Sequence, residues 1–264
     1  MHPIERLRWV ARARDEAPTA LAAEAAWTIS ELAIDEPSAV VTACRRLVES
    51  HVTVGPLWWV SASLLVAPDP AQTASRVVGE LLSDPTAELL AAALNRSFAA
   101  DAAIVVSCPA STALEALSYR PSTVVRVVAS SSGLDGEARR FAAVAGSVSA
   151  WEFGQAFEAV DGAAVVVVEA LAAGSRGLLV SAATALLVGA ARDSSIPLWG
   201  LAGVGRVLHG QLFEEMLRRS GDEVELIEPA ALEVVVGPSG PGSPAEGLSR
   251  GACPLAPELL VRAG

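Results

Sequence analysis

The pattern of apolar and polar positions divides the chain into two parts. Through about residue 100, apolar residues recur at spacings of three and four, as at Val40, Cys44, Leu47 and Val48, which is typical of one face of an α-helix. Prolines near several segment starts support helix starts there. The pattern predicts helices at residues 3–15, 19–33, 37–51, 57–66, 71–83 and 86–99, with Gly55 and Pro56 breaking it before the fourth.

After Asp101, short valine-rich runs alternate with helical segments. Strands are expected at residues 102–106, 123–128, 147–151, 164–168, 197–201, and at 224–227 or 232–236. Helices are expected near residues 110–117, 136–144, 152–160, 181–192 and 207–220. This alternation predicts a mostly parallel sheet covered by helices on both faces.

The predicted fold class is therefore α/β. A helical N-terminal domain at residues 1–100 precedes a doubly wound, Rossmann-like domain at residues 101–264. Residues 237–251 are rich in glycine, proline and serine, so we expect a flexible loop there.

Charge and composition exclude several classes of partner. The net charge is −11, and a chain without a basic excess is a poor binder of nucleic acid or of anionic membranes. The apolar runs are too short for a transmembrane helix. The sequence contains no lysine, which excludes a Schiff-base lysine and a P-loop.

Cysteine and histidine usage points to a cytoplasmic protein without a metal or cofactor. The three cysteines, Cys44, Cys108 and Cys253, lie far apart and form no Cys-x-x-Cys pair, which favours reduced thiols over disulfides or a zinc site. The three histidines show no metal-ligand spacing. The first residues do not resemble a signal peptide.

The loop at residues 107–112 is the first candidate site. A predicted strand leads into it and a predicted helix follows, so the unpaired amides of the helix start form a seat for an anion. Cys108 lies there, at the strand end where open α/β folds bind ligands.

Two further loops follow later strands. Residues 130–133 read Ser-Ser-Ser-Gly and are either a phosphate loop or an ordinary polar turn. Gly203 and Gly205 favour a sharp turn near the same sheet edge. A dinucleotide site is the weaker interpretation, because that fingerprint belongs to the first β–α unit.

Six segments resemble the sequence motifs of one protein family, and they occur in the same order along the chain. They are Val54-Gly-Pro-Leu-Trp-Trp-Val-Ser-Ala-Ser-Leu-Leu65, Val105-Val-Ser-Cys-Pro-Ala-Ser-Thr-Ala-Leu-Glu-Ala-Leu117, Val127-Val-Ala-Ser-Ser-Ser-Gly-Leu-Asp-Gly136, Val165-Val-Val-Val-Glu-Ala-Leu171, Ser195-Ile-Pro-Leu-Trp-Gly200 and Cys253-Pro-Leu-Ala-Pro-Glu-Leu-Leu260. Together they resemble the translation initiation factor 2B alpha/beta/delta family, which also contains methylthioribose-1-phosphate isomerase and ribose-1,5-bisphosphate isomerase. The resemblance spans roughly residues 20–262.

The resemblance implies a catalytic pair. In the isomerases a cysteine and an aspartate move a proton on an opened sugar, and the matching positions here are Cys108 and Glu169. Packing in the core is the alternative role for Cys108. Three polar groups of the family are missing: its phosphate-gripping arginine is Ser131 here, and its asparagine and lysine are absent from residues 180–184.

These departures favour a binding or regulatory role over catalysis. The leading hypothesis is a divergent relative that binds a phosphorylated sugar or nucleotide and is a homodimer. The alternatives are an active aldose–ketose phosphate isomerase that uses Cys108 and Glu169, and a structural subunit of a larger assembly. The predicted ligand-binding residues are Ser107, Ala110, Ser111, Thr112, Ser130, Ser131, Ser132, Arg176, Gly203 and Arg206.

Overall fold

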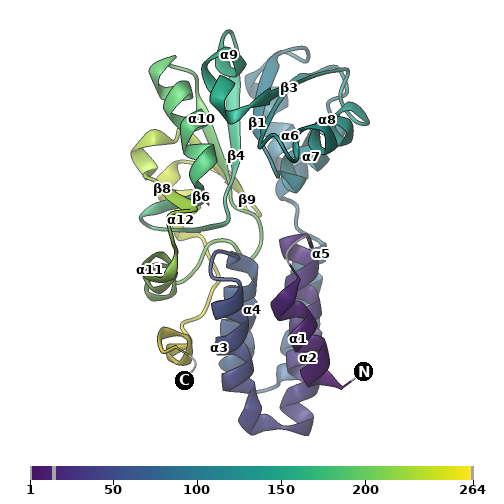
Figure 1. The fold of residues 1–264 in the computed structure, drawn as a ribbon, viewed down its shortest axis with the longest axis vertical. Helices are drawn as coiled ribbons and strands as arrows, with labels where there is room; N and C mark the ends of the chain where they lie inside the picture. Colours follow the sequence, from purple (N-terminus) through teal and green to yellow (C-terminus); the bar gives the residue numbers. More distant parts are fainter. Residues whose placement is uncertain (1, 14–15, 263–264) are drawn as a thin grey trace.

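The computed structural model describes residues 2–13 and 16–262. Its first part is a bundle of helices, and its second part is a sheet with helices on both faces (Figure 1). This organisation confirms the predicted α/β class. Within the described residues, no helix is both long and apolar enough to cross a membrane.

The helices of the first part begin close to the predicted positions. They are α1 (Pro3–Arg12), α2 (Pro18–Asp35), η1 (Pro37–Ala39), α3 (Val40–Ser50), α4 (Gly55–Leu65), α5 (Pro70–Leu82) and α6 (Thr86–Ser97). The predicted end of the first helix, at residues 14–15, lies outside the described residues. We refer to α1–α5 as the helical half, because α6 packs on the sheet.

The start of α4 corrects one prediction. Gly55 and Pro56 do not break the helical pattern but open the helix, since proline in the first turn has no amide to leave unpaired. Gly55 also lies against the second half. Its amide donates to the Leu171 carbonyl at 3.1 Å, and a Cβ atom would lie 2.8 Å from that oxygen.

The main sheet has the strand order β10-β9-β7-β4-β1-β2-β3 within the described residues. Its strands are β1 (Ala103–Ser107), β2 (Val124–Ala129), β3 (Ser147–Glu152), β4 (Val165–Glu169), β7 (Leu198–Leu201), β9 (Val234–Gly237) and β10 (Gly240–Gly242). All neighbouring pairs are parallel except β9 and β10. The order reverses between β1 and β4, so the switch point of the sheet lies there.

Helices cover both faces of this sheet. Helices α6, α7 (Ser111–Ser118) and α8 (Leu134–Ala142) pack on one face, and α9 (Ala156–Val160) and α10 (Ala182–Asp193) pack on the other. The short helix η2 (Phe153–Gln155) precedes α9. The carboxyl ends of the parallel strands face the helical half (Figure 1).

A small antiparallel sheet was not predicted. It consists of β5 (Ala172–Gly174), β6 (Gly177–Ser181) and β8 (Val224–Ile227), in the order β5-β6-β8. Gly177 has φ +142°, and a Cβ atom there would lie 2.0 Å from the Ile227 carbonyl oxygen. The alternatives at 224–227 and 232–236 both form strands, since β9 occupies most of the second range.

The segment 237–251 is not the flexible loop expected from its composition. It contains β10 and helix α12 (Pro244–Ser249), and η3 (Pro229–Ala231) precedes it. Ser243 and Glu246 cap α12 reciprocally. This serine–glutamate spacing is the sequence signal that was missed.

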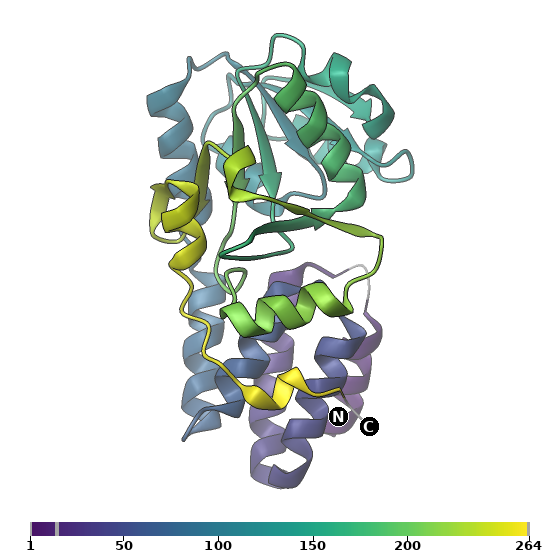
Figure 2. The same cartoon turned by 90° about the vertical axis from the view of Figure 1, so that its left-hand side faces the viewer.

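One apolar core joins the two halves. Trp58 and Trp59 of α4 pack in a cluster with Leu212 and Phe213 of α11 (Gly210–Arg219). The two tryptophans therefore pack the helical half against the α/β half. The C-terminal segment, with η4 (Pro257–Leu260), runs from α12 along the helical half and adds Leu259 to the same cluster (Figure 2).

Candidate functional site

The switch point brings three predicted site regions together. Cys108 follows β1, Glu169 ends β4, and Arg206 reaches Glu169 from the loop after β7. With Ser107 and Thr112 they form what we call the strand-end cluster. Because β1 and β4 are parallel neighbours, their carboxyl ends meet at one edge.

Glu169 occupies the anion seat at the start of α7. Its carboxylate accepts a hydrogen bond from the Thr112 amide at 3.0 Å and from the Thr112 hydroxyl at 3.1 Å. Arg206 approaches the same carboxylate at 2.5 Å and also donates to the Ala170 carbonyl. The Arg206 and Glu169 side chains are 8% and 5% exposed. The anion-binding position predicted at the start of α7 is therefore occupied by the protein's own carboxylate, that of Glu169.

Cys108 lies in a poor environment for a thiolate. It is buried among the apolar residues below α7, and its amide donates to the Val128 carbonyl at 2.8 Å. Burial raises the thiol pKa, and the charges of Glu137 and Glu169 raise it further, against the opposing effect of Arg140. The thiol therefore stays protonated near neutral pH.

We predict that no cysteine of the folded protein reacts readily with a thiol reagent at pH 8. Burial raises the pKa of Cys44 to about 12 and that of Cys253 to about 11. Because a raised pKa keeps the thiol protonated until the pH approaches that value, less than about one part in a thousand is thiolate at pH 8. Titration with Ellman's reagent checks this, with guanidinium-unfolded protein as the control.

The unfolded protein should expose three reactive thiols at once. Fast labelling of a single thiol in the folded protein, lost in Cys108→Ser, would contradict the sealed environment of Cys108.

Within the strand-end cluster, the Ser107 hydroxyl bonds to the Thr184 hydroxyl at 2.7 Å. The other predicted residues do not join the cluster. Ala110 is buried and Ser111 is exposed. The loop of Ser130, Ser131 and Ser132 is exposed. Arg176 pairs with Glu214 at 3.0 Å and does not line the cluster.

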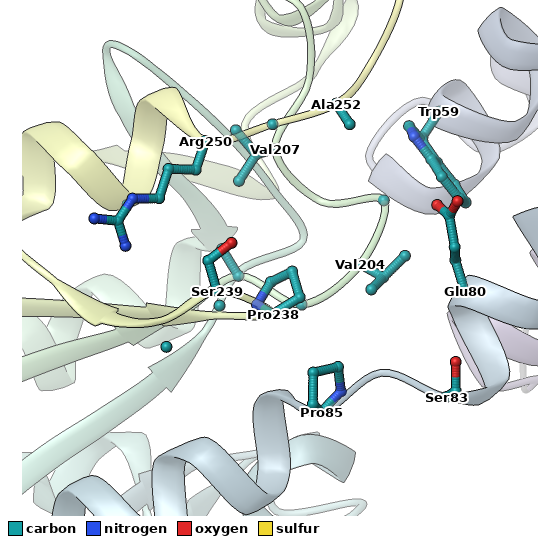
Figure 3. A pocket seen from close by; sticks show the side chains of 17 residues that line it. Trp59, Glu80, Ser83, Pro85, Val204, Val207, Pro238, Ser239, Arg250 and Ala252 are labelled. Atoms are coloured by element: carbon teal, nitrogen blue, oxygen red, sulfur yellow. The ribbon is translucent and has the colours of Figure 1, made fainter.

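An open cavity lies beside the cluster, at the ends of β7 and β9, which are the next two strands of the sheet after β4. It has a volume of about 340 Å³ and lies between the helical half and the α/β half. We call it the β7–β9 cavity (Figure 3). It is lined by Trp59, Glu80, Ser83 and Pro85 on the helical side, and by residues 202–205, 207, 237–240, 247 and 250–252 on the other.

The loop at residues 203–207 forms one wall of the cavity. Asp84 fixes it by accepting the Val204 amide at 2.7 Å. A Cβ atom at Gly203 would lie 2.4 Å from that carboxylate, and Gly205 has φ +77° with Trp59 only 3.0 Å from where its Cβ atom would stand. Both glycines are therefore required by close approach or by backbone conformation.

Solved structures share this architecture over most of their length. A chain of the tetrameric eIF2B-beta2-delta2 complex from C. thermophilum aligns with a TM-score of 0.74 at 15% identity, covering 93% of this chain and 92% of that chain. The translation initiation factor eIF-2B of Pyrococcus horikoshii OT3 aligns at 0.72 and 16%, covering 94% and 98%. This chain has the eIF2B-subunit fold. The resemblance predicted from the sequence is thereby confirmed in its architecture.

The eIF2B fold is also shared by an enzyme. The 5-methylthioribose 1-phosphate isomerase of P. horikoshii OT3 aligns with a TM-score of 0.61 at 14% identity, covering 93% of this chain and 85% of that chain. No protein-family model and no curated protein sequence matches the chain.

Sequence reasoning missed most of the β7–β9 cavity. Of the predicted ligand-binding residues, Gly203 lines it. Asp84 precedes a proline at a predicted helix start, and Trp59 lies in an apolar run, so neither carries a local signal of a site. Arg250 and Ser239 lie in the segment interpreted as a flexible loop. Among the described residues, no group of three His, Cys, Asp or Glu side chains is placed to hold a metal ion.

Proposed function

We propose that this chain is a non-catalytic protein of the eIF2B fold that binds a phosphorylated sugar or nucleotide in the β7–β9 cavity, in a regulatory role. One observation carries the proposal. The cavity is open at the ends of β7 and β9, whereas Cys108 and Glu169 are buried and Glu169 is already paired. Isomerase chemistry at that pair is not favoured.

The α/β wall of the cavity offers groups suited to a phosphate. Within the described residues, the amides of Gly203 and Gly205 donate to no protein acceptor, unlike those of Val204 and Arg206. Free amides in a glycine turn bind anions. Arg250 stands at the edge of the cavity with its guanidinium turned outward (Figure 3). It is 41% exposed, and its guanidinium lies 3.8 Å from the Glu246 carboxylate, so its side chain is free to turn.

The helical wall offers groups suited to the rest of the ligand. Glu80 and Ser83 are acceptors for sugar hydroxyls, and Trp59 supplies an apolar surface. A ligand that touches both walls stabilises one arrangement of the two halves, because binding to one state shifts the population toward it. This is the basis of the regulatory role, and a cytoplasmic location remains part of the proposal.

The predicted homodimer also belongs to this proposal. The chain from C. thermophilum comes from a tetrameric complex, which supports association in this fold. Light scattering at several protein concentrations tests it. A mass of two chains is expected, and a mass of one chain throughout would overturn the dimer without affecting the cavity.

Ligand binding should appear as a thermal shift. At one hundred times its dissociation constant a ligand adds about 2.7 kcal/mol of stability, which is several degrees for a chain of this size. The panel contains ribose and ribulose phosphates, methylthioribose 1-phosphate, nucleoside monophosphates and inorganic phosphate. Arg250→Ala should weaken the response by removing the cation at the cavity edge.

Arg176→Ala is the matched control. Arg176 is also an exposed arginine paired with one glutamate, but it does not line the cavity. Its response should equal that of the wild type. Absence of any shift across the panel would contradict the proposed function.

A further inference from the structure

The 203–207 loop has two sides that face different sites. On one side, Gly203, Val204, Gly205 and Val207 line the β7–β9 cavity. On the other side, the Arg206 side chain enters the strand-end cluster and meets Glu169 at 2.5 Å. One short segment therefore touches the open cavity and the sealed switch point at the same time.

Each end of this loop is tied to a different part of the molecule. Asp84 of the helical side accepts the Val204 amide, and the same carboxylate accepts the Thr86 amide at 3.0 Å. Toward the other end, the Arg206 carbonyl accepts the Ala173 amide at 2.7 Å, and the Leu208 amide donates to Ala173 at 2.9 Å. The Arg206 side chain adds the buried tie to Glu169 and Ala170.

We propose that the 203–207 loop couples the two sites, so that the Glu169–Arg206 pair holds the cavity wall in its ligand-binding conformation and a bound ligand in turn stabilises that pair. This inference rests on the proposed function of the cavity. Arg206 is a positioning residue: it lies between the glycine turn and β4, so its anchorage fixes where the amides of Gly203 and Gly205 point. Coupling between two binding events is reciprocal.

The mechanism follows from the flexibility of the glycines. Gly203 and Gly205 permit many backbone conformations, so the ties at Val204 and Arg206 decide which one is populated. Without the contact between Arg206 and Glu169, the loop samples other conformations. The ligand affinity falls, because part of the binding free energy is then used to order the loop. With a ligand across the cavity, the conformation that places Arg206 on Glu169 is favoured.

The test compares two variants that each remove a buried ion pair. Glu169→Gln/Arg206→Gln removes both charges of the loop anchor together, so no lone buried charge remains. Glu215→Gln/Arg219→Gln is the matched control, because that pair is also buried, at 2.6 Å, but lies on α11 outside the cavity lining. If the Glu169→Gln/Arg206→Gln variant does not fold, Arg206→Lys is measured in its place.

Calorimetric titration with ribose 5-phosphate and with inorganic phosphate gives the affinities. We expect about 10-fold weaker binding in the loop-anchor variant, within the usual range of coupling between sites, and less than about twofold change in the control. Hydrogen exchange of the amides at 203–207 should be faster in the unliganded loop-anchor variant and slower in the liganded wild type.

The outcomes separate the two ideas. Wild-type affinity in the loop-anchor variant, or unchanged exchange at 203–207, would overturn the coupling and leave the cavity's function standing. Equal losses in both variants would also overturn it, because they report general destabilisation. If the wild type binds neither probe nor any other member of the panel, the proposed function fails and the coupling fails with it.

Discussion

Arg206→Met is expected to lower the free energy of unfolding by about 3–5 kcal/mol, the usual cost of removing one partner of a buried ion pair. The variant keeps most of the apolar volume but leaves the Glu169 carboxylate buried. Thr112 would then be its remaining hydrogen-bond partner among the contacts of the structure. The Ala170 carbonyl and the Glu169 carboxylate would both lose the donor that Arg206 provides. The Arg206 side chain is only 8% exposed. Urea unfolding followed by circular dichroism measures the change.

The control for this prediction removes both charges. Glu169→Gln/Arg206→Gln should lose less stability than Arg206→Met, because a buried pair replaced as a unit leaves no uncompensated charge. A loss below about 1 kcal/mol in Arg206→Met would show that solvent reaches Glu169, and would contradict the sealed strand-end cluster.

Trp58→Ala is expected to cost about 3–5 kcal/mol of stability, as for other large-to-small changes of buried aromatic residues. The side chain is fully buried at the join between the halves. Its indole N–H donates to the Val52 carbonyl at 2.9 Å, and the Arg219 guanidinium lies 5.2 Å from the ring centroid. The substitution removes apolar packing, one buried hydrogen bond and one cation–π contact together.

Trp27→Ala serves as the comparison for Trp58→Ala. Trp27 lies on α2 and is 40% exposed, so its loss should cost about 1 kcal/mol or less. Both variants are measured by urea unfolding with the slope of the transition checked for constancy. Equal effects at the two positions would mean that the join between the halves contributes little to the stability of the fold.

The sequence by itself determined the order and type of most elements. Helical periodicity and prolines at helix starts are local signals, and they placed α2, α5 and α6 within a few residues. Buried valine runs such as 165–168 are equally local and predicted the parallel sheet. Because the carboxyl ends of parallel strands share an edge, the sequence also predicted that Cys108, Glu169 and Arg206 lie near one another.

The elements that were missed depend on contacts between distant residues. The hairpin of β5 and β6 is recognisable only from its pairing with β8 and from the close approach of Gly177 to Ile227. The apolar character of residues 177–181 is compatible with a strand or with the start of a buried helix. Pairing decided between these two possibilities.

Only the tertiary structure decided which site is closed and which is open. Glu169 and Arg206 are 37 residues apart, and Asp84 and Val204 are 120 residues apart. No local pattern encodes either contact, because the partners meet only after the sheet and the helical half have packed. The charge of Glu169 could be read from the sequence, but its neutralisation by Arg206 could not. The strand types and their shared edge are local chemistry, whereas the sealed cluster and the β7–β9 cavity are consequences of how the two halves dock.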